Sequence, residues 1–347
     1  MGEEATAWGG ELWAAADLVT PMAIRVAATL RLADHIVAGT QTTEALAAAV
    51  DADRDTLERV LEHLVTARVL SHAETGGYRL TDLGQHLRDD DPDGLRPWLD
   101  LDGAVGRADL SVVQLLHTVR TGEPGFPRQF GRSFWDDLSA DPRMASSFDA
   151  LMGYRLVADA PTIADSYAWG TLGHVVDVGG GDGSLLIAIL RAHGELRGTV
   201  IDLPGPAAHA EQAFESAGLS ARAEAKAGSF FDPLPRGAGG YVLSGVLRDW
   251  DDEHALHILK RCAEASADTG TVFVIEESLD GGAADTGMDL RLLSFCGGRD
   301  RTLDQLREMA ASVGLEVHSV SPAGRRSIVE LRHAVTSTDD ARGGSQR

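Results

Sequence analysis

The sequence from His174 onward alternates short apolar strands with stretches of helical spacing, and this alternation restricts the fold more than any other feature. The first strand and its glycine turn read HVVDVGGGDG, and a helical stretch, SLLIAIL, follows directly. Strands separated by helices are typical of a parallel sheet with helices on both faces. We therefore predict an α/β domain with a Rossmann-like, doubly wound sheet over residues 169–335. The other expected strands are GTVIDLP, RAEAKAGSFF, GGYVLSGVL, GTVFVIEES, LEVHSVSP and SIVELRHA.

The glycine turn after the first strand indicates a ligand that approaches the backbone closely. The turn runs from Asp177 to Gly183, and Asp202 ends the next strand, 19 residues after Gly183. A carboxylate at that place can accept both hydroxyls of an adenosine ribose. The turn lacks the Gly-Lys-Ser/Thr ending of a phosphate loop, and Asp182 would repel a pyrophosphate. S-adenosylmethionine, an adenosine that carries a cation and no phosphate, fits best; the alternative is that the glycines only permit the turn.

The first ninety residues predict a small, mostly helical domain. Apolar residues recur at helical spacing over 11–37, with a break expected near Thr20 because Pro21 interrupts the pattern. Two short helices follow, the second from Asp53 to Ala67, and then a hairpin with a strand at 78–80. Two helices and a hairpin predict a winged helix over 1–90.

This winged helix is expected to pack and dimerise rather than to bind DNA. Its second helix carries acidic residues at 53, 55, 58 and 62, whereas a helix that reads bases should be basic. The formal net charge of −22 also disfavours nucleic acid. The apolar face of residues 12–33 is too long for one small domain to cover, which favours a homodimer.

The remaining segments complete the expected organisation. Residues 91–168 predict a helical linker that contributes helices to the substrate pocket, and 336–347 have the composition of a disordered tail. The two cysteines, Cys262 and Cys296, fit neither a disulfide framework nor a metal site. No signal peptide and no membrane-spanning run is visible, so we expect a cytoplasmic protein without metal or membrane partners.

Five segments together resemble the family of S-adenosylmethionine-dependent small-molecule O-methyltransferases that have a winged-helix dimerisation domain. They are VVDVGGGDGSL, VIDLPGP, AGSFFDPLP, YVLSGVLRDWDDEHALHILKRCAEA and GMDLRLLSFCGGRDRTLDQL. The resemblance extends from residue 12 to residue 333, and bacterial enzymes that tailor natural products such as naphthoates are the most similar. It implies S-adenosylmethionine as cofactor, a homodimer, and a phenolic hydroxyl of a naphthoate- or anthraquinone-like polycyclic aromatic as the methyl acceptor.

The resemblance also implies a set of cofactor-binding residues. They are Gly179, Gly181, Asp202, Leu203, Ser229, Phe230, Ser244 and Trp250. Within this set the glycines line the methionine and ribose, Asp202 binds the ribose hydroxyls, and the aromatic residues hold the adenine. The chain departs from the pattern at Ser229, where many relatives have aspartate, and at Ser244, where several plant relatives have lysine.

The catalytic residues implied by the resemblance are Arg248, Glu276 and Asp300. The family usually has a histidine base at position 248, oriented by two acids that match Glu276 and Asp300. Arginine cannot be deprotonated in a protein, so Arg248 cannot act as that base. We expect it to stabilise a phenolate, with both acids holding its guanidinium. Asp251 or Asp252 is expected to cap the helix that follows.

Scattered residues are expected to line the acceptor pocket, although plain core positions are the alternative for each. They are Trp13, Trp135, Met152, Tyr154, Arg155, Phe295 and Cys296. The missing histidine also leaves two other functions open. The chain could use the cofactor for a reaction other than methylation, such as hydroxylation, or it could be a regulator that senses the cofactor.

Overall fold

The computed structural model describes residues 4–74, 76–267, 270–277, 279 and 286–334. The chain divides into two compact units, Met1–Leu110 and Ser111–Arg347. The predicted boundaries at residues 90 and 168 do not coincide with this division and stay a prediction. The predicted disordered tail, 336–347, lies outside the described residues.

The amino-terminal unit contains the predicted winged helix. Its elements are α1 (Glu4–Ala16), α2 (Val19–Thr29), α3 (Leu32–Val37), α4 (Thr43–Ala49), α5 (Arg54–Thr66), β1 (Leu70–His72), β2 (Tyr78–Leu80), α6 (Asp82–Gln85), α7 (Arg96–Leu99) and α8 (Ala104–Asp109). The strands β1 and β2 pair antiparallel, with Leu70 opposite Leu80. Leucines from α3, α4 and α5 pack in one core with Leu70 and Tyr78 of the two strands, so the wing and the helices share one interior.

Side chains at the helix starts explain where the first helices begin. Asp17 accepts hydrogen bonds from the N–H groups of Val19 and Thr20, and α2 begins at Val19, one residue before Thr20, near which the break was expected. Pro21 then lies in the first turn of α2, where its missing N–H costs no helical bond. A second break, at Arg31, was not expected; its backbone is left-handed, with φ of 52°.

The carboxyl-terminal unit contains the α/β domain. Its elements are η1 (Leu110–Gln114), α9 (Leu115–Thr121), α10 (Gly125–Phe130), α11 (Phe134–Ala140), α12 (Pro142–Asp165), η2 (Trp169–Leu172), β3 (His174–Val178), α13 (Ser184–Ala192), β4 (Arg197–Asp202), α14 (Pro204–Ser216), β5 (Ala223–Ala227), β6 (Gly240–Ser244), η3 (Leu247–Asp249), α15 (Asp252–Ser266), β7 (Thr271–Glu277), α16 (Thr286–Cys296), α17 (Leu303–Ser312), β8 (Leu315–Ala323) and β9 (Arg326–His333). All the strands predicted from the sequence are present.

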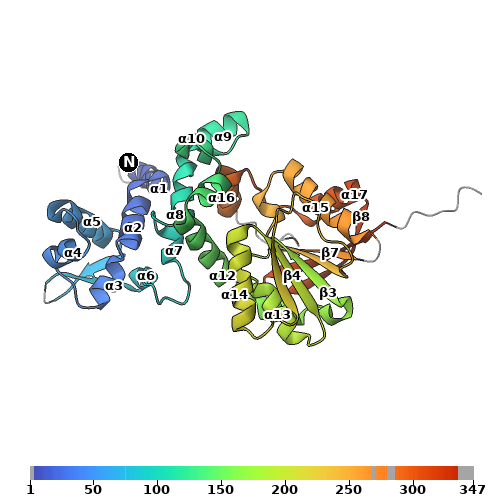
Figure 1. Cartoon of the computed structure of the whole chain (residues 1–347). Helices are drawn as coiled ribbons and strands as arrows, with labels where there is room; N and C mark the ends of the chain where they lie inside the picture. The colour runs from blue at the N-terminus through green and yellow to red at the C-terminus, as the bar shows by residue number, and fades with distance from the viewer. Residues whose placement is uncertain (1–3, 75, 268–269, 278, 280–285, 335–347) are drawn as a thin grey trace, which may run out of the picture. The chain divides into compact units, whose positions relative to one another are not determined.

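The sheet has the order β5-β4-β3-β6-β7-β9-β8. Figure 1 labels β3, β4, β7 and β8 in it. The strands β5, β4, β3, β6 and β7 run parallel, and β9 is antiparallel to both of its neighbours. The chain winds outward in opposite directions from β3 and β6. Open α/β sheets bind ligands at the carboxyl ends of the strands where this reversal occurs. The prediction of a doubly wound α/β fold with an amino-terminal winged helix is confirmed.

The strands alternate their side chains between two layers of helices. Val176, Val274 and their neighbours pack with α15 and α17 on one face. Val175, Phe273 and their neighbours pack with α12, α13 and α14 on the other. Because side chains alternate along a strand, Asp177 shares the face of Val175, and Glu276 shares the face of Val274. Among the described residues, no helix is long and apolar enough to span a bilayer.

Candidate active site

The glycine loop between β3 and α13 forms the first part of the site. Gly179 and Gly181 have φ values of 73° and 59°, which side-chain-bearing residues adopt only with strain. A Cβ atom on Gly179 would also lie 2.9 Å from Cγ2 of Val246, in the segment that follows β6. The loop therefore needs glycine for its own conformation and for its close approach to the segment that follows β6.

Asp202, at the end of β4, binds directly to this loop. One carboxylate oxygen accepts the N–H of Gly181 at 2.8 Å, and the other accepts the N–H of Leu203 at 2.7 Å. Burial raises the pKa of Asp202, and these two hydrogen bonds oppose the rise. Each oxygen keeps a lone pair for a further donor. The structure thus brings the predicted ribose carboxylate and the glycine loop together, with the side chain of Leu203 half exposed beside them.

Asp177, at the same edge of the sheet, was not predicted as a site residue. Its side chain is 2% exposed, and neither carboxylate oxygen has a hydrogen-bond partner among the described residues. Burial, followed by the charges of Asp202 and Asp182, raises the pKa of Asp177 to about 7. A buried carboxylate without a partner is costly. A positively charged ligand at this edge would offset this cost electrostatically, which is an argument in favour of S-adenosylmethionine.

Asp149 adds a further carboxylate to the same region. It lies on α12, and one of its oxygens is 3.5 Å from Nδ1 of His209 on α14. Burial raises the pKa of Asp149; His209 opposes the rise, while the charges of Asp202 and Asp182 add to it. We call Asp149, Asp177, Asp182 and Asp202 the cofactor-end carboxylates. Among the described residues, none of the four forms an ion pair with an arginine or a lysine.

Arg248 forms the second part of the site, in the short helix η3 that follows β6. Its Nη2 is 2.9 Å from Oδ1 of Asp300, and its side chain is largely buried. Burial alone would lower the pKa of Arg248, but the charges of Glu276 and Asp300 raise it. The guanidinium therefore stays charged. Its Nε–H is buried and has no partner among the described residues.

Glu276, near the end of β7, completes the predicted catalytic set. Its side chain is 7% exposed, and its Oε1 has no hydrogen-bond partner within the described part of the chain. Burial raises the pKa of Glu276 to about 7, and the charge of Arg248 opposes this rise. The structure places Arg248, Glu276 and Asp300 around one small cavity.

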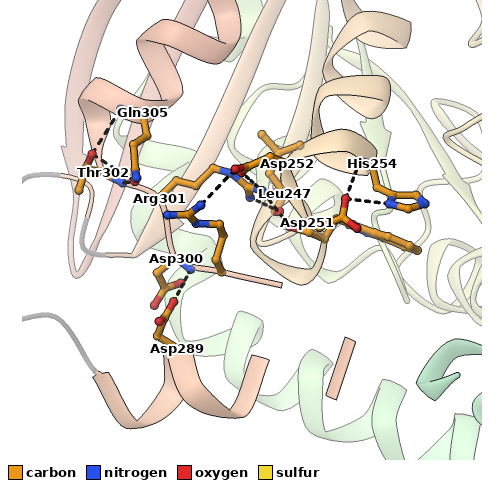
Figure 2. A network of polar contacts seen from close by, with 11 residues as sticks. Leu247, Asp251, Asp252, His254, Asp289, Asp300, Arg301, Thr302 and Gln305 are labelled. Atoms are coloured by element: carbon orange, nitrogen blue, oxygen red, sulfur yellow. Dashed lines mark hydrogen bonds and ion pairs between the residues drawn. The ribbon is translucent and has the colours of Figure 1, made fainter. Parts of the chain in front are cut away.

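Arg301 holds the turn that carries Arg248, and the sequence analysis missed it. Figure 2 shows its guanidinium reaching the backbone of η3 and the start of α15. It donates to the carbonyl oxygens of Leu247 at 2.6 Å and Trp250 at 2.9 Å, and it pairs with Asp252 at 2.9 Å. Asp251 caps α15 by accepting the N–H of His254, as predicted. The motif GGRDRT would have pointed to Arg301 only if the fold had been known.

Aromatic side chains connect the glycine loop with α11. Trp250 stacks on Trp135, with ring centroids 5.5 Å apart and planes 16° apart. Phe230 meets Trp250 edge to face at 5.8 Å, and its ring also lies beside Gly179. Ser229 accepts the N–H of Phe231 and so shapes this turn. The structure therefore places Ser229, Phe230 and Trp250 near the predicted cofactor loop, and Trp135 next to them.

The other predicted site residues lie in several places. Ser244 ends β6, and its hydroxyl oxygen is buried without a partner among the residues described. Met152, Tyr154 and Arg155 lie on α12, where Tyr154 is 53% exposed and Arg155 pairs with Glu277 at 3.2 Å. On α16, Phe295 is buried against Phe134, and burial raises the pKa of the Cys296 thiol. Trp13 lies on α1 in the amino-terminal unit and is 77% exposed. Their roles toward an acceptor stay predictions.

One group of metal-ligand type occurs among the described residues, outside the predicted site. His86, Asp91 and Asp93 offer ligand atoms within 4.8 Å of one another in the amino-terminal unit. Groups of exposed acids are common without an ion, and no predicted site residue belongs to this one.

Comparison with family models identifies the family of the chain. A model described as the O-methyltransferase domain matches residues 113–316, and one described as the O-methyltransferase dimerisation domain matches residues 13–89. The chain belongs to the O-methyltransferase family. The predicted family is therefore confirmed, and the dimerisation model matches the unit in which the winged helix lies.

Individual relatives agree with this assignment. This O-methyltransferase is 53% identical over 331 residues to 2,7-dihydroxy-5-methyl-1-naphthoate 7-O-methyltransferase from Streptomyces carzinostaticus, covering 95% of this chain and 99% of the relative. It is 46% identical over 321 residues to the aclacinomycin 10-hydroxylase RdmB from Streptomyces purpurascens, covering 90% and 85%.

A solved relative matches both sequence and fold. The crystal structure of NcsB1, an O-methyltransferase from neocarzinostatin biosynthesis, in complex with S-adenosylmethionine and 2-hydroxy-5-methyl naphthoic acid, superposes with a TM-score of 0.90. The two chains are 53% identical, and the match covers 93% of this O-methyltransferase and 98% of NcsB1. The predicted cofactor class and the predicted reaction class agree with this relative.

Proposed function

We propose that this O-methyltransferase transfers the methyl group of S-adenosylmethionine to a phenolic hydroxyl of a polycyclic aromatic acceptor, such as a naphthoate or an anthraquinone, in the making of a natural product. One observation carries the proposal: carboxylates without a balancing arginine line one part of the site, and a buried arginine held by an acid lies in the other. The first suits a cationic methyl donor. The second suits a phenolate.

The glycine loop and the cofactor-end carboxylates would hold the methyl donor. Asp202 would accept the ribose hydroxyls, while Phe230 and Trp250 would flank the adenine. Asp177 would supply an uncompensated negative charge. When bound, S-adenosylmethionine supplies a methyl group on a positively charged sulfur, which an oxygen nucleophile can displace directly.

Arg248 would supply the charge that the acceptor needs. A phenol has a pKa of about 10, like tyrosine, so only about one in a thousand is ionised at neutral pH. A fixed cation beside the oxygen lowers that pKa and stabilises the developing phenolate. Because Asp300 holds the guanidinium in place, Arg248 would act without reorganising, while proximity would account for much of the remaining rate.

Mass spectrometry of single reactions tests this proposal. The purified protein is incubated with S-adenosylmethionine and a panel of naphthols, hydroxynaphthoates and hydroxyanthraquinones. We expect products heavier by one methylene group and formation of S-adenosylhomocysteine in equal amount. Products heavier by one oxygen would instead favour hydroxylation, the reaction for which the 46% identical relative is named. Binding of the cofactor without any product would favour a regulator.

We further propose that two copies of the chain form a homodimer through the amino-terminal unit. Large apolar side chains are exposed on α1, on α2 and between them, at Leu12, Trp13, Leu18 and Val19, and all but Leu12 lie within the match to the dimerisation model. Apolar side chains gathered in this way favour a protein partner. Light scattering should give twice the chain mass of 36.8 kDa at micromolar concentration, and a double variant, Leu12→Asp with Val19→Asp, should shift it toward the single chain.

A further inference from the structure

A small cavity lies next to Arg248, at the carboxyl ends of β6 and β7. Its volume is about 20 Å³, and its walls include Arg248, Glu276, Asp300, Val274 and Leu306. About one water molecule fits in a space of this size, provided that polar partners are present. The cavity is therefore large enough for a water and too small for a substrate.

Two buried polar atoms on the residues that line this cavity complement each other. The Nε–H of Arg248 is a donor, and Oε1 of Glu276 is an acceptor. Both atoms are buried, and neither has a hydrogen-bond partner among the residues described. An unpaired buried donor or acceptor destabilises a protein, because it has lost its hydrogen bonds to water. A single bound water could pair with both atoms.

We propose that a water in this cavity links Arg248 to Glu276, and that Glu276 accepts the proton which the acceptor hydroxyl loses during methyl transfer. This inference rests on the proposed function and names the destination of the proton. In the step, the phenolic O–H bond breaks and its proton passes through the water to Oε1 of Glu276. The freed electron pair forms the oxygen–methyl bond, while the sulfur–methyl bond breaks and leaves its electron pair on sulfur.

The other acids near the cavity are less suited to this role. Asp300 is half-buried and already accepts from Arg248 at 2.9 Å. Glu277 also lines the cavity, but its carboxylate pairs with Arg155 and with Arg326, each at 3.2 Å. Glu276 is the acid in the described cavity wall that combines burial with an unpaired oxygen.

The charges that face Glu276 tune it for proton transfer. Burial raises its pKa to about 7; Arg248 and Arg326 oppose the rise, whereas Asp249 and Asp300 add to it. A general base works best when its pKa lies near the working pH, because it is then both ionised and basic. The ordinary carboxyl pKa of about 4.3 would leave a proton transfer from a phenol much further uphill.

Glu277, Arg299 and Arg301 complete the charged groups that line the cavity. Arg301 is committed to Asp252 and to two backbone carbonyls, and Arg299 also pairs with Asp252. The two arginines cannot accept a proton, and no oxygen of Glu277 is buried without a partner among the described atoms. Burial raises the pKa of Asp300 as well, but Asp300 already accepts from Arg248, so Glu276 is the lining acid that combines a raised pKa with an unpaired oxygen.

The decisive variant is Glu276→Gln, which keeps the size of the side chain but cannot accept the proton. It is compared on two acceptors: an unsubstituted naphthol, and a nitronaphthol that is already ionised at neutral pH. We expect the rate with the naphthol to fall by about a hundredfold, a size typical of general base catalysis, and the rate with the nitronaphthol by less than about threefold. The matched control, Glu277→Gln, should change both rates by the same factor.

The pH dependence of kcat gives a second test of the inference. For the wild type with the naphthol, kcat should fall as the pH drops through about 7, because protonated Glu276 cannot accept a proton. Glu277→Gln should keep this acidic limb, and Glu276→Gln should lose it. An equal loss of rate on both acceptors, or an acidic limb that survives in Glu276→Gln, would overturn the inference while leaving the proposed methyl transfer intact.

A third measurement does not depend on activity. Infrared difference spectra of the ligand-free protein should show protonated carboxyl bands that disappear with a midpoint near pH 7, because Asp177, Asp249 and Glu276 all have a pKa raised to about 7. Subtracting the spectra of Glu276→Gln from those of the wild type should leave one such band, which belongs to Glu276. A Glu276 carboxyl that stays ionised throughout this range would overturn the inference. A wild type that methylates no phenol would overturn the proposed function itself, which the mass spectra reveal separately.

Discussion

The two ends of the site occupy the same edge of one sheet but use charge in opposite ways. At the ends of β3 and β4, Asp177 is buried and Asp202 is partly buried, and neither pairs with an arginine or lysine among the described residues. At the ends of β6 and β7, Arg248 is surrounded by Glu276 and Asp300. The first end is unbalanced without its ligand, whereas the second is balanced by the protein itself. The difference supports the proposed ligands: a cation would bind at the first end, and a neutral molecule that becomes an anion would bind at the second.

The largest expected effect concerns the unbalanced end without ligand. Asp177→Asn should raise the free energy of unfolding of the ligand-free protein at pH 8 by up to about 4 kcal/mol, because the folded protein then no longer holds the unpaired charge of this carboxylate. The pKa of Asp177 rises from 3.8 to about 7 on folding, so the free energy of unfolding of the wild type falls as the pH rises through that range. The gap between variant and wild type should therefore shrink on acidification.

Urea unfolding of the ligand-free protein at pH 8 and at pH 5 measures this gap. Asp232→Asn, which changes an exposed carboxylate in the same unit, is the control and should have little effect at either pH. If Asp177→Asn destabilises the protein at pH 8, the two ends do not differ in the way that we describe.

The next effect concerns cofactor affinity at the same end. Asp202→Ala should weaken the binding of S-adenosylhomocysteine by about 2–3 kcal/mol, because it removes a charged acceptor for the ribose hydroxyls. It also removes the hydrogen bond that orders the N–H of Gly181. Isothermal titration calorimetry gives the affinity directly. Equal affinity in wild type and variant would show that the ribose binds elsewhere.

A smaller effect is expected at the balanced end. Arg248→Ala should lower the rate with an acidic polycyclic phenol by about tenfold to a hundredfold, or about 1.4–2.7 kcal/mol. The apparent pKa of the pH–rate profile should rise at the same time, because the charge of Arg248 opposes the raised pKa of Glu276. Arg299→Ala is the matched control, since Arg299 is exposed and pairs with Asp252. Full activity with an unchanged profile in Arg248→Ala would remove the arginine from the mechanism.

The smallest effect sharpens the comparison within the cofactor end. Asp149→Asn should reduce the preference for S-adenosylmethionine over S-adenosylhomocysteine by about two- to fivefold, because the two ligands differ by one positive charge. The ratio of their two dissociation constants reports this preference. Asp165→Asn changes an exposed acid at the far end of the same helix and should leave the ratio unchanged. A ratio that does not respond to Asp149 would mean that the carboxylates do not act on the sulfonium charge.

Local patterns carried most of what the sequence could predict. The strands, the glycine loop and the cap at Asp251 follow from residues that lie close together in the chain, so their conformations could be inferred from spacing. The positions of Arg248, Glu276 and Asp300 came from the resemblance, and the structure brings them together. The unpaired state of Asp177 could not be foreseen, because it depends on which side chains from other strands fail to reach it. The hydrogen bonds of Arg301 to η3, and the contact between Asp149 and His209, depend in the same way on packing between distant segments.

The hydrogen bonds of Arg301 have a consequence for the order in which the protein folds. Asp202 reaches the glycine loop across 21 residues, whereas Arg301 reaches Leu247 across 54 residues and Trp250 across 51. Closing a longer loop costs more chain entropy, and contacts between distant segments form more slowly. During synthesis, moreover, the ribosome completes β3 and β4 well before Arg301 emerges. We therefore expect a refolding chain to regain the binding of S-adenosylhomocysteine before it regains the ability to transfer a methyl group.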